Sequence, residues 1–327
     1  MSDKEPARIG IFGAARIVKD SLLAPALQVD GVHVAAIAAR DPLRARAYAD
    51  KQGIPRVHSS YEAILADPDI DAVYVALPAA LHAEWTIASV QTSKHVLCEK
   101  PFTSNTAAAQ RVESVAASSD RVVMEACHTH YHPPHSRLRE IQASGEIWNV
   151  RSAWATFCIP VPPGRDIRWN LAWGGGCLLD VGYYPVRTLT GLFGPTPHVK
   201  DSRAWTREDV DRRIESTLQF DNGVTGKIMS SLWSRQLLSM QLSIQGEAGQ
   251  MQVTRPYHPQ MGSRIKVKGI GGHRTERTTR KSTYTYQLEA FRDSIRQRTG
   301  VATDCAAAVL LQTLDAIYGA AGLEPRP

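Results

Sequence analysis

The chain has 327 residues, of which 43% are hydrophobic and 21% are charged, and its formal net charge is +6. A single hydrophobic core stops growing at about 250 to 300 residues, so this length predicts two domains. The longest apolar stretch, residues 72–81, is far too short to cross a membrane, and residues 1–6 contain no apolar signal region. Five cysteines without a Cys-x-x-Cys spacing argue against a disulfide framework. We therefore expect a cytoplasmic protein with no membrane partner.

The first predicted strand, residues 8–12, runs into a turn of small residues and then a helix. This order is typical of the first unit of a dinucleotide-binding fold, where small residues let the backbone approach a pyrophosphate. The glycine spacing, Gly10 and Gly13 followed by Ala15, is not a full G-x-G-x-x-G, and a tightly packed structural turn is the alternative. Pro25 should end the helix early.

The second predicted strand, residues 33–38, ends in Ala39 and Arg40, and Asp41 and Pro42 then suit the N-cap and first position of a helix. An acid at the end of this strand would bind the ribose hydroxyls of NAD, whereas a small residue followed by arginine suits the 2′-phosphate of NADP. The sequence therefore predicts NADP(H) as the preferred cofactor, with NAD(H) possible. The alternative for Arg40 is a surface arginine near a helix start.

Strands and helices continue to alternate as far as residue 126, which predicts a parallel sheet and a first, dinucleotide-binding domain over residues 1–126. The further predicted elements are a helix capped near residues 59–62, a strand over 72–77, a helix over 82–92, a strand over 96–98, a helix from 103–105 to 118 and a strand over 121–126.

The strand over 96–98 leads into Glu99, Lys100 and Pro101. The proline ring disfavours an αR conformation for Lys100, so the lysine is held in an extended backbone at one edge of the sheet. Lys100 is therefore a candidate catalytic residue, and a solvated loop is the alternative.

Residues 127–135 contain four histidines, His128, His130, His132 and His135. An extended chain would place the first three on one face, as a transition-metal site requires. No carboxylate or cysteine nearby completes such a site, so we predict no metal and expect histidines that line a cleft.

From residue 147 onward the sequence predicts a second, mostly antiparallel domain, residues 127–327, with the last two helices packing back on the first domain. A turn at 221–223 predicts a hairpin. The predicted strands are 147–159, 216–220, 224–233 and 237–244, and the last helices are 286–298 and 305–320.

A helix predicted over residues 174–187 interrupts these strands. Asp180 and Tyr184 stand four residues apart, so the helix presents a carboxylate and a phenol on one face. Pro185 removes a backbone donor and should kink the helix beside Tyr184. A structural aspartate with a buried tyrosine is the alternative.

The positive charge is concentrated in residues 264–281, which contain seven basic residues and one acid and so carry the net charge of the whole chain. Aromatic or helical elements that read nucleic acid are missing from this strip, so we expect no nucleic-acid partner. A solvated charged hairpin and a patch that attracts an anionic substrate both remain open.

Several motifs in order resemble the Gfo/Idh/MocA oxidoreductases, over nearly the whole chain, and most closely the branch of dimeric dihydrodiol dehydrogenases and sugar ketoreductases. The motifs are Gly10-x-x-Gly13-Ala-Ala-Arg16, Leu77-Pro78 with His82, Cys98-Glu-Lys-Pro101, Asp166-Ile-Arg-Trp169 and Gly174-Gly-Gly-x-Leu-x-Asp180-x-Gly-x-Tyr184.

The resemblance implies a Rossmann domain followed by an α/β domain with a large, mostly antiparallel open sheet, through which a homodimer or homotetramer would form. It also implies a nicotinamide cofactor, Tyr184 as general acid/base assisted by Lys100 and Asp180, and a sugar, nucleotide sugar, cyclitol or cyclic trans-diol as substrate. Similar sequences carry arginine where this chain has His130. The implied cofactor-binding residues are Gly10, Gly13, Ala14, Ala15, Arg16, Ile17, Arg40, Leu77, Pro78, His82, Glu99, Lys100 and Pro101, and the implied substrate-binding residues are His128, Arg168, Trp169, Asp180 and Tyr184.

Two other functions are compatible with this fold: an NADP-binding sensor without catalysis, and a glycosidase that uses the cofactor transiently. The sequence leaves open the exact substrate, the physiological direction and the size of the oligomer.

Overall fold

The computed structural model describes residues 5–297 and 307–327 and divides the chain into two compact units. The first unit comprises the described residues of Met1–Thr103, Ala107–Tyr131 and Tyr284–Ala307, and the second comprises Ser104–Thr106, His132–Thr283 and Ala308–Pro327. The chain leaves the first unit after Tyr131 rather than after residue 126, because Tyr131 still packs against the core of that unit.

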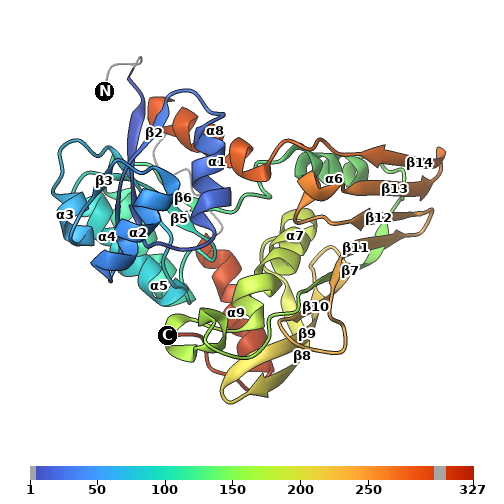
Figure 1. The fold of residues 1–327 in the computed structure, drawn as a ribbon. Helices are drawn as coiled ribbons and strands as arrows, with labels where there is room; N and C mark the ends of the chain where they lie inside the picture. The colour runs from blue at the N-terminus through green and yellow to red at the C-terminus, as the bar shows by residue number, and fades with distance from the viewer. Residues whose placement is uncertain (1–4, 298–306) are drawn as a thin grey trace. The chain divides into compact units, whose positions relative to one another are not determined.

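The first unit is built on a six-stranded parallel sheet with the order β3-β2-β1-β4-β5-β6 (Figure 1). The order reverses between β1 and β4, and ligands of such sheets bind outside the carboxyl ends of the strands at this point. The predicted parallel sheet is confirmed. The strands are β1 (Ala7–Phe12), β2 (Val32–Ala38), β3 (Arg56–Val57), β4 (Ala72–Val75), β5 (His95–Glu99) and β6 (Val123–Ala126).

Local capping fixes where the helices of this unit begin. The Asp41 carboxylate accepts a hydrogen bond from Leu43 N–H at 3.0 Å, which confirms the predicted cap. The helix predicted to be capped near residues 59–62 is capped by Ser60, whose Oγ accepts a hydrogen bond from Ala63 N–H at 3.2 Å. The first helical segment ends at Ala26, just after Pro25. The helices are η1 (Lys19–Leu23), α1 (Ala24–Ala26), α2 (Pro42–Gln52), α3 (Tyr61–Leu65), η2 (Ala79–Leu81), α4 (His82–Gln91), α5 (Thr106–Ala117) and α8 (Thr283–Gln297).

The second unit contains an eight-stranded sheet with the order β14-β13-β12-β11-β7-β10-β9-β8. Neighbouring strands are antiparallel except β7 and β10, which are parallel, so the predicted large and mostly antiparallel sheet is confirmed. The strands are β7 (Val150–Cys158), β8 (His198–Arg207), β9 (Val210–Gln219), β10 (Thr225–Ser231), β11 (Ser239–Gly246), β12 (Gln250–Thr254), β13 (Arg264–Gly269) and β14 (Gly272–Arg277).

The two faces of this sheet differ in polarity. On β7, Ala153, Ala155 and Phe157 are buried, and α7 packs against this strand and β10, whereas Trp154 points to the opposite face and is 41% exposed. The helices of the second unit are α6 (Pro133–Ala143), η3 (Ile167–Trp169), η4 (Leu171–Trp173), the π turn η5 (Leu178–Gly182), α7 (Tyr183–Phe193), η6 (Pro259–Met261) and α9 (Ala307–Ala320).

The last two helices were both predicted to pack on the first domain, but only one of them does so. Leu288 and Phe291 of α8 join the core of the first unit, but α9 belongs to the second unit, apart from its first residue. The physical reason is that Asp315 and Tyr318 of α9 hydrogen-bond to residues of the second unit. Within residues 5–297 and 307–327, no helix combines the length and hydropathy that a membrane crossing requires.

Candidate active site

The turn after β1 requires glycine. Gly13 has φ +95°, and a Cβ at this position would lie 2.6 Å from the carbonyl oxygen of Ala76. Its N–H donates to the Ala38 carbonyl at 2.8 Å, so the turn is fixed between the ends of β2 and β4. A Cβ at Gly10 would lie 2.7 Å from Ile64 Cγ2. Close packing therefore excludes a side chain at both glycines. At Gly13 this keeps the turn tight at the sheet edge where dinucleotides bind in such folds.

Two arginines stand beside this turn. Arg40 is exposed directly after β2, as predicted, and Arg44 Nη2 donates to the Ala14 carbonyl oxygen at 3.0 Å. Burial raises the pKa of Tyr61, and the positive charges of the two nearby arginines oppose this rise. Arg44 was not among the residues predicted from the sequence. Its signal was its place in the first turn of α2, from which side chains point back toward the strand end.

The Lys100 loop is held by two buried glutamates. The Glu99 carboxylate accepts the Lys100 N–H at 3.1 Å, and the Glu125 carboxylate accepts the Phe102 N–H at 2.8 Å. The Lys100–Pro101 peptide bond is cis. These bonds position the backbone that carries the Lys100 side chain at the carboxyl end of β5.

Glu99 is only 9% exposed, and its side chain is turned into the unit. It accepts a short hydrogen bond from the Tyr74 hydroxyl, which lies 2.7 Å from Ser21 Oγ. Burial raises the pKa of Glu99, and the bonds from Tyr74 and Lys100 oppose that rise. Glu99 therefore organises the Lys100 loop, and its predicted contact with the cofactor stays a prediction.

His82 joins two of the predicted motifs. Its Nδ1 lies 2.8 Å from the Pro101 carbonyl oxygen and its Nε2 lies 2.8 Å from the Leu77 carbonyl oxygen. The ring is 1% exposed, and burial lowers its pKa against the effect of the two carbonyl groups. The predicted residues Leu77, Pro78 and His82 thus lie with the Lys100 loop at one edge of the first unit.

Three further predicted site residues, Tyr184, Asp180 and Arg168, lie in the second unit. Tyr184 is 5% exposed, and its ring lies 5.5 Å from that of Phe157 and 5.7 Å from that of Tyr257. Arg168 Nε donates to Asp180 Oδ2 at 2.6 Å, so the structure brings together two of the predicted substrate-binding residues.

Arg168 is bound on both sides by carboxylates. Its Nη1 donates to Asp166 at 3.1 Å, and the attraction of Asp180 and Asp166 raises the pKa of Arg168. Asp180, which the sequence predicts to assist Tyr184 and bind substrate, thus also holds an arginine. A fixed cation with N–H groups suits the hydroxyl or carbonyl oxygens of a polar substrate.

The helical segment that carries Asp180 and Tyr184 contains an irregularity just before the position of the kink predicted at Pro185. A π turn, Leu178–Gly182, leads directly into α7 at Tyr183, and Pro185 is the third residue of α7. Single π turns inside helices frequently occur at functional sites, so the irregularity agrees with the predicted role of this segment.

The histidines do not form the extended run that would place them on one face. His130 N–H donates to the Cys127 carbonyl in a turn, and His128 is 1% exposed with its ring 4.4 Å from that of Tyr284. His132 is also buried, which lowers its pKa to about 4. Among the residues that the structure describes, no group of three histidine, cysteine or acidic side chains could hold a metal ion. The substrate contact predicted for His128 stays a prediction.

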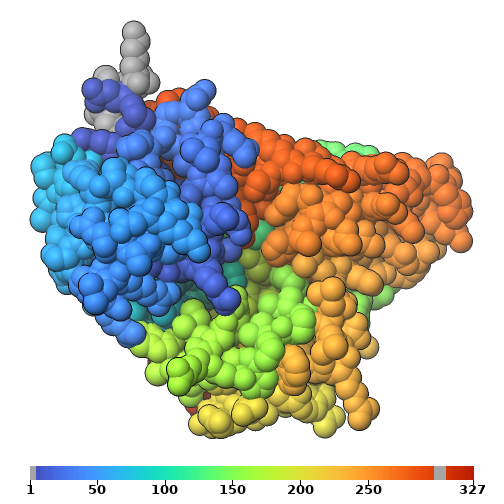
Figure 2. Space-filling model, viewed as in Figure 1, coloured from blue at the N-terminus to red at the C-terminus, as the bar shows by residue number. Residues whose placement is uncertain are grey.

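The basic strip is an edge hairpin, β13–β14, which lies at the right margin of Figure 2 in orange. Lys266 and Lys268 alternate with the buried residues Ile265 and Val267, so they point away from the helices that cover the sheet. Arg274 is neutralised by ion pairs with Glu146 and Glu276. Within the second unit, Lys266 and Lys268 therefore lie on the opposite sheet face from Tyr184.

A glycine turn at the switch point of a parallel sheet is typical of a dinucleotide-binding protein. Residues 7–127 match the oxidoreductase family with an NAD-binding Rossmann fold, Gfo/Idh/MocA, and residues 135–252 match the Gfo/Idh/MocA C-terminal domain. The chain belongs to the Gfo/Idh/MocA oxidoreductase family.

Named relatives agree with this assignment. The chain is 33% identical over 317 residues to D-xylose 1-dehydrogenase (NADP(+)) 2 of Haloferax volcanii, covering 95% of this chain and 96% of the relative. It is 32% identical over 258 residues to trans-1,2-dihydrobenzene-1,2-diol dehydrogenase of Mus musculus, covering 77% and 76%. The crystal structure of KijD10, a 3-ketoreductase from Actinomadura kijaniata in complex with NADP and TDP-benzene, superposes with a TM-score of 0.88 at 27% identity, covering 97% and 98%.

Proposed function

We propose that the protein is an NADP(H)-dependent oxidoreductase that interconverts a secondary alcohol and a ketone on a sugar or nucleotide sugar. Cyclitols and cyclic trans-diols belong to the same chemical class and are included. The proposal is supported by the relatives, among which are an NADP-dependent sugar dehydrogenase, a dihydrodiol dehydrogenase and a ketoreductase crystallised with NADP and TDP-benzene.

The residues of the first unit fit this cofactor. Gly13 keeps the turn after β1 tight, because a side chain there would meet the Ala76 carbonyl, and a tight turn of small residues lets the backbone approach a pyrophosphate. Arg40 and Arg44 would bind the 2′-phosphate, since two guanidinium groups beside the same turn match a dianion. When bound, the nicotinamide supplies or accepts the hydride.

Tyr184 would move the proton. In reduction its phenol O–H bond breaks, the proton goes to the carbonyl oxygen of the substrate and the product is an alcohol; in oxidation the phenolate takes the proton back. Lys100 would stabilise the negative charge on oxygen, as donors of an oxyanion hole do. A phenol has an ordinary pKa of about 10, so an ammonium partner makes it a better base near neutral pH.

Arg168 and Asp180 would orient the substrate. Their 2.6 Å ion pair is a fixed pair of donor and acceptor, and Asp180 comes from the same helical segment as Tyr184. This shared segment is the observation that carries the proposal, because a sensor without catalysis has no need of a proton donor beside a substrate-binding carboxylate.

The outer face of the second sheet would form a homodimer or homotetramer. It spans eight strands, is polar and contains the exposed Trp154 at its centre, on β7. An aromatic side chain within a polar face is typical of protein interfaces.

The test is a spectrophotometric screen of sugars, nucleotide sugars, cyclitols and dihydrodiols with NADPH and NADH, followed by Tyr184→Phe on the best substrate. We expect kcat to fall by about 10² to 10⁴ with little change in cofactor affinity, which is the usual contribution of a positioned general acid. Wild-type kcat in Tyr184→Phe would show that another group moves the proton. Hydrolysis of a glycoside without net change in NADPH absorbance would favour a glycosidase instead.

A further inference from the structure

The helix that carries Asp180 and Tyr184 begins on a buried carboxylate. Asp211, on β9, is fully buried, and its Oδ2 accepts a hydrogen bond from Leu178 N–H at 2.8 Å. Leu178 is the first residue of the π turn, and the residue before it makes no side-chain cap. Because N–H groups at a helix start lack partners within the helix, Asp211 takes the place of the missing cap.

The close approach of Asp211 explains one residue of the Gly174–Gly176 run. Gly176 has φ +136°, and a Cβ there would lie 2.0 Å from Asp211 Oδ1. The same glycine donates its N–H to the Arg168 carbonyl oxygen at 3.0 Å. Asp211 therefore lies against both the helix start and the segment that carries Arg168.

The charge of Asp211 is balanced from the far end of the described chain. Arg326 is 3% exposed, and its Nη2 donates to Asp211 Oδ1. The Tyr318 hydroxyl donates to the same oxygen at 3.2 Å, and the Arg326 guanidinium lies 4.3 Å from the centre of the Tyr318 ring. Asn105 Nδ2 also fixes the Arg326 carbonyl oxygen, at 2.8 Å. A buried carboxylate needs such partners, and removing the cation would leave an unbalanced charge under the helix start.

We propose that Arg326 is a positioning residue for the reaction. By neutralising Asp211 it keeps that carboxylate bound to the Leu178 N–H, and it thereby fixes the helix start that presents Asp180 and Tyr184. This inference rests on the proposed function, since it takes Tyr184 to be the proton donor. Arg326 acts through Asp211 and the helix and has no contact of its own with the substrate.

The test measures kcat per cofactor-binding site, with the sites counted by fluorescence titration of NADPH. Arg326→Ala should lower kcat about 10- to 100-fold, because displacement of a reacting group by about 1 Å has effects of this size. The cofactor affinity should stay unchanged. Counting sites removes the contribution of unfolded protein, which a merely structural role would produce.

Two double variants separate positioning from charge burial. Asp211→Asn with Arg326→Ala removes both charges and keeps an oxygen that accepts the Leu178 N–H, so kcat should return to within about threefold of wild type. Asp211→Ala with Arg326→Ala also removes both charges but has no acceptor, so its kcat should stay low. The matched control is Arg151→Ala, which breaks an exposed ion pair with Glu247 in the same unit and should leave kcat unchanged.

The proposal is overturned if Arg326→Ala keeps wild-type kcat per site, or if the two double variants have equal kcat. If Arg326→Ala does not accumulate as folded protein, the comparison of the two double variants decides alone. Tyr184→Phe is measured beside them. Loss of kcat in Tyr184→Phe without any loss in the Arg326 variants would refute only the positioning role, whereas full activity of Tyr184→Phe would refute the proton transfer by Tyr184 on which the positioning role rests.

Discussion

Strand β5 has a lysine directly before it and another directly after it, and the two are bound in different ways. The Lys94 ammonium is buried and donates to the carbonyl oxygens of Asp67 and Ile70 at 2.7 and 2.8 Å. At Lys100, by contrast, the hydrogen bond to Glu99 is made by the backbone N–H, and it fixes the loop rather than the ammonium. The Lys94 side chain therefore ties the amino end of β5 to neighbouring backbone, whereas at the carboxyl end hydrogen bonds fix the backbone of the loop that carries Lys100, the residue proposed to act in the reaction.

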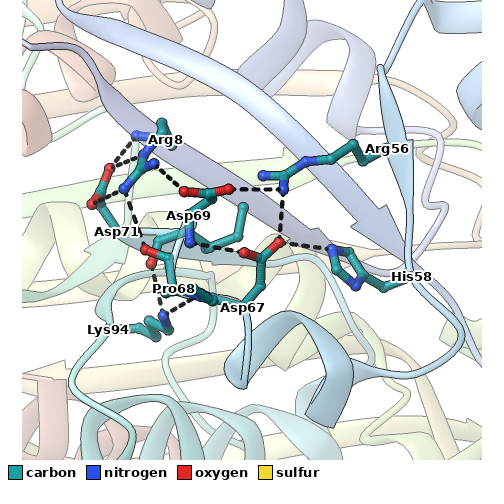
Figure 3. A network of polar contacts seen from close by, with 9 residues as sticks. Arg8, Arg56, His58, Asp67, Pro68, Asp69, Asp71 and Lys94 are labelled. Carbon is teal, nitrogen blue, oxygen red and sulfur yellow. Dashed lines mark hydrogen bonds and ion pairs between the residues drawn. The ribbon is translucent and has the colours of Figure 1, made fainter.

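The polar networks at the two ends of the parallel sheet also differ, in how deeply they are buried. At the amino ends of β1 and β4, Arg8 pairs with Asp69 and Asp71, and Arg56 and His58 lie 3.0 Å from Asp67, in a network that is partly exposed (Figure 3). At the carboxyl ends, the bonds of Tyr74, Glu99 and Glu125 are buried. Exposed ion pairs contribute little to stability, whereas buried networks fix a single geometry.

The largest expected effect is on kcat, and it should separate the two lysines when each is replaced by alanine. Lys100→Ala should lower kcat by about 10² to 10⁴, because the oxygen that gains charge loses its cationic donor. Lys94→Ala should leave kcat unchanged and lower the free energy of unfolding by about 1 to 3 kcal/mol, since buried carbonyl groups lose a donor. Steady-state kinetics and urea unfolding measure both. Loss of kcat in Lys94→Ala would refute the division of tasks.

Tyr184→Phe combined with Lys100→Ala sharpens this result. If the two groups act as one unit, the double variant should lose much less than the product of the single losses. Independent, multiplying losses would show that Lys100 and Tyr184 serve different steps.

The next effect concerns pH and the first residue of β5. His95 Nδ1 accepts the Val122 N–H at 2.9 Å, and burial lowers the pKa of His95 to about 4. The pKa of His95 in the folded protein lies below its ordinary value of 6.5, so the unfolded chain takes up the proton first as the pH falls. The stability contributed by neutral His95 is therefore complete above pH 6.5 and is lost as the pH falls toward 4. We expect a loss of about 2 to 3 kcal/mol across this window. His95→Gln keeps an acceptor and does not titrate, so its thermal stability should fall less steeply; parallel curves would contradict the prediction.

A smaller effect should appear at the carboxyl end of β2. Arg40→Ala should weaken NADPH binding at least tenfold and leave NADH binding unchanged, because a charge-assisted hydrogen bond is worth about 1.5 to 3 kcal/mol and only NADPH has the 2′-phosphate. Fluorescence titration measures both affinities. Arg46→Ala, at an exposed arginine on α2, the helix that follows Arg40, is the control. Equal loss of both cofactors would mean that Arg40 supports the turn rather than the phosphate.

Local patterns predicted much of the first unit, because its order is encoded by residues near one another in the chain. Asp41 and Ser60 cap the helices that follow them, and the apolar runs alternate with helices as a parallel sheet requires. The polar edge strand β8 was not predicted, since its residues are mostly half-buried or exposed and show no apolar alternation. The location of α9 was predicted wrongly, because it depends on partners more than 100 residues away in the chain.

The same distinction applies to the candidate site. Asp180 and Tyr184 could be placed on one helix from their spacing alone, and the Glu99–Pro101 motif marked the loop. The contact of Arg44 with the Ala14 carbonyl and the support of Leu178 by Asp211 join residues about 30 apart in the chain, across turns whose geometry no local pattern gives. Such tertiary contacts decide how the predicted residues are held.

The smallest effect lies inside the network of Figure 3, where two aspartates share Arg8. The side chain of Asp69 is 63% exposed and makes ion pairs of 2.8 Å with Arg8 and 3.6 Å with Arg56, both at the surface, so Asp69→Asn should change the free energy of unfolding by less than about 1 kcal/mol. Asp71 is 14% exposed and also accepts the Arg8 backbone N–H at 2.8 Å, so Asp71→Asn should have the larger effect, about 1 to 3 kcal/mol. Urea unfolding at low salt and at 1 M salt measures both. Salt should remove the effect of Asp69→Asn and leave most of that of Asp71→Asn, because exposed charges are screened far more than buried hydrogen bonds. Equal effects with equal salt dependence would mean that the amino-end network acts as one buried unit, and the contrast between the two ends of β5 would then lie in chemistry alone.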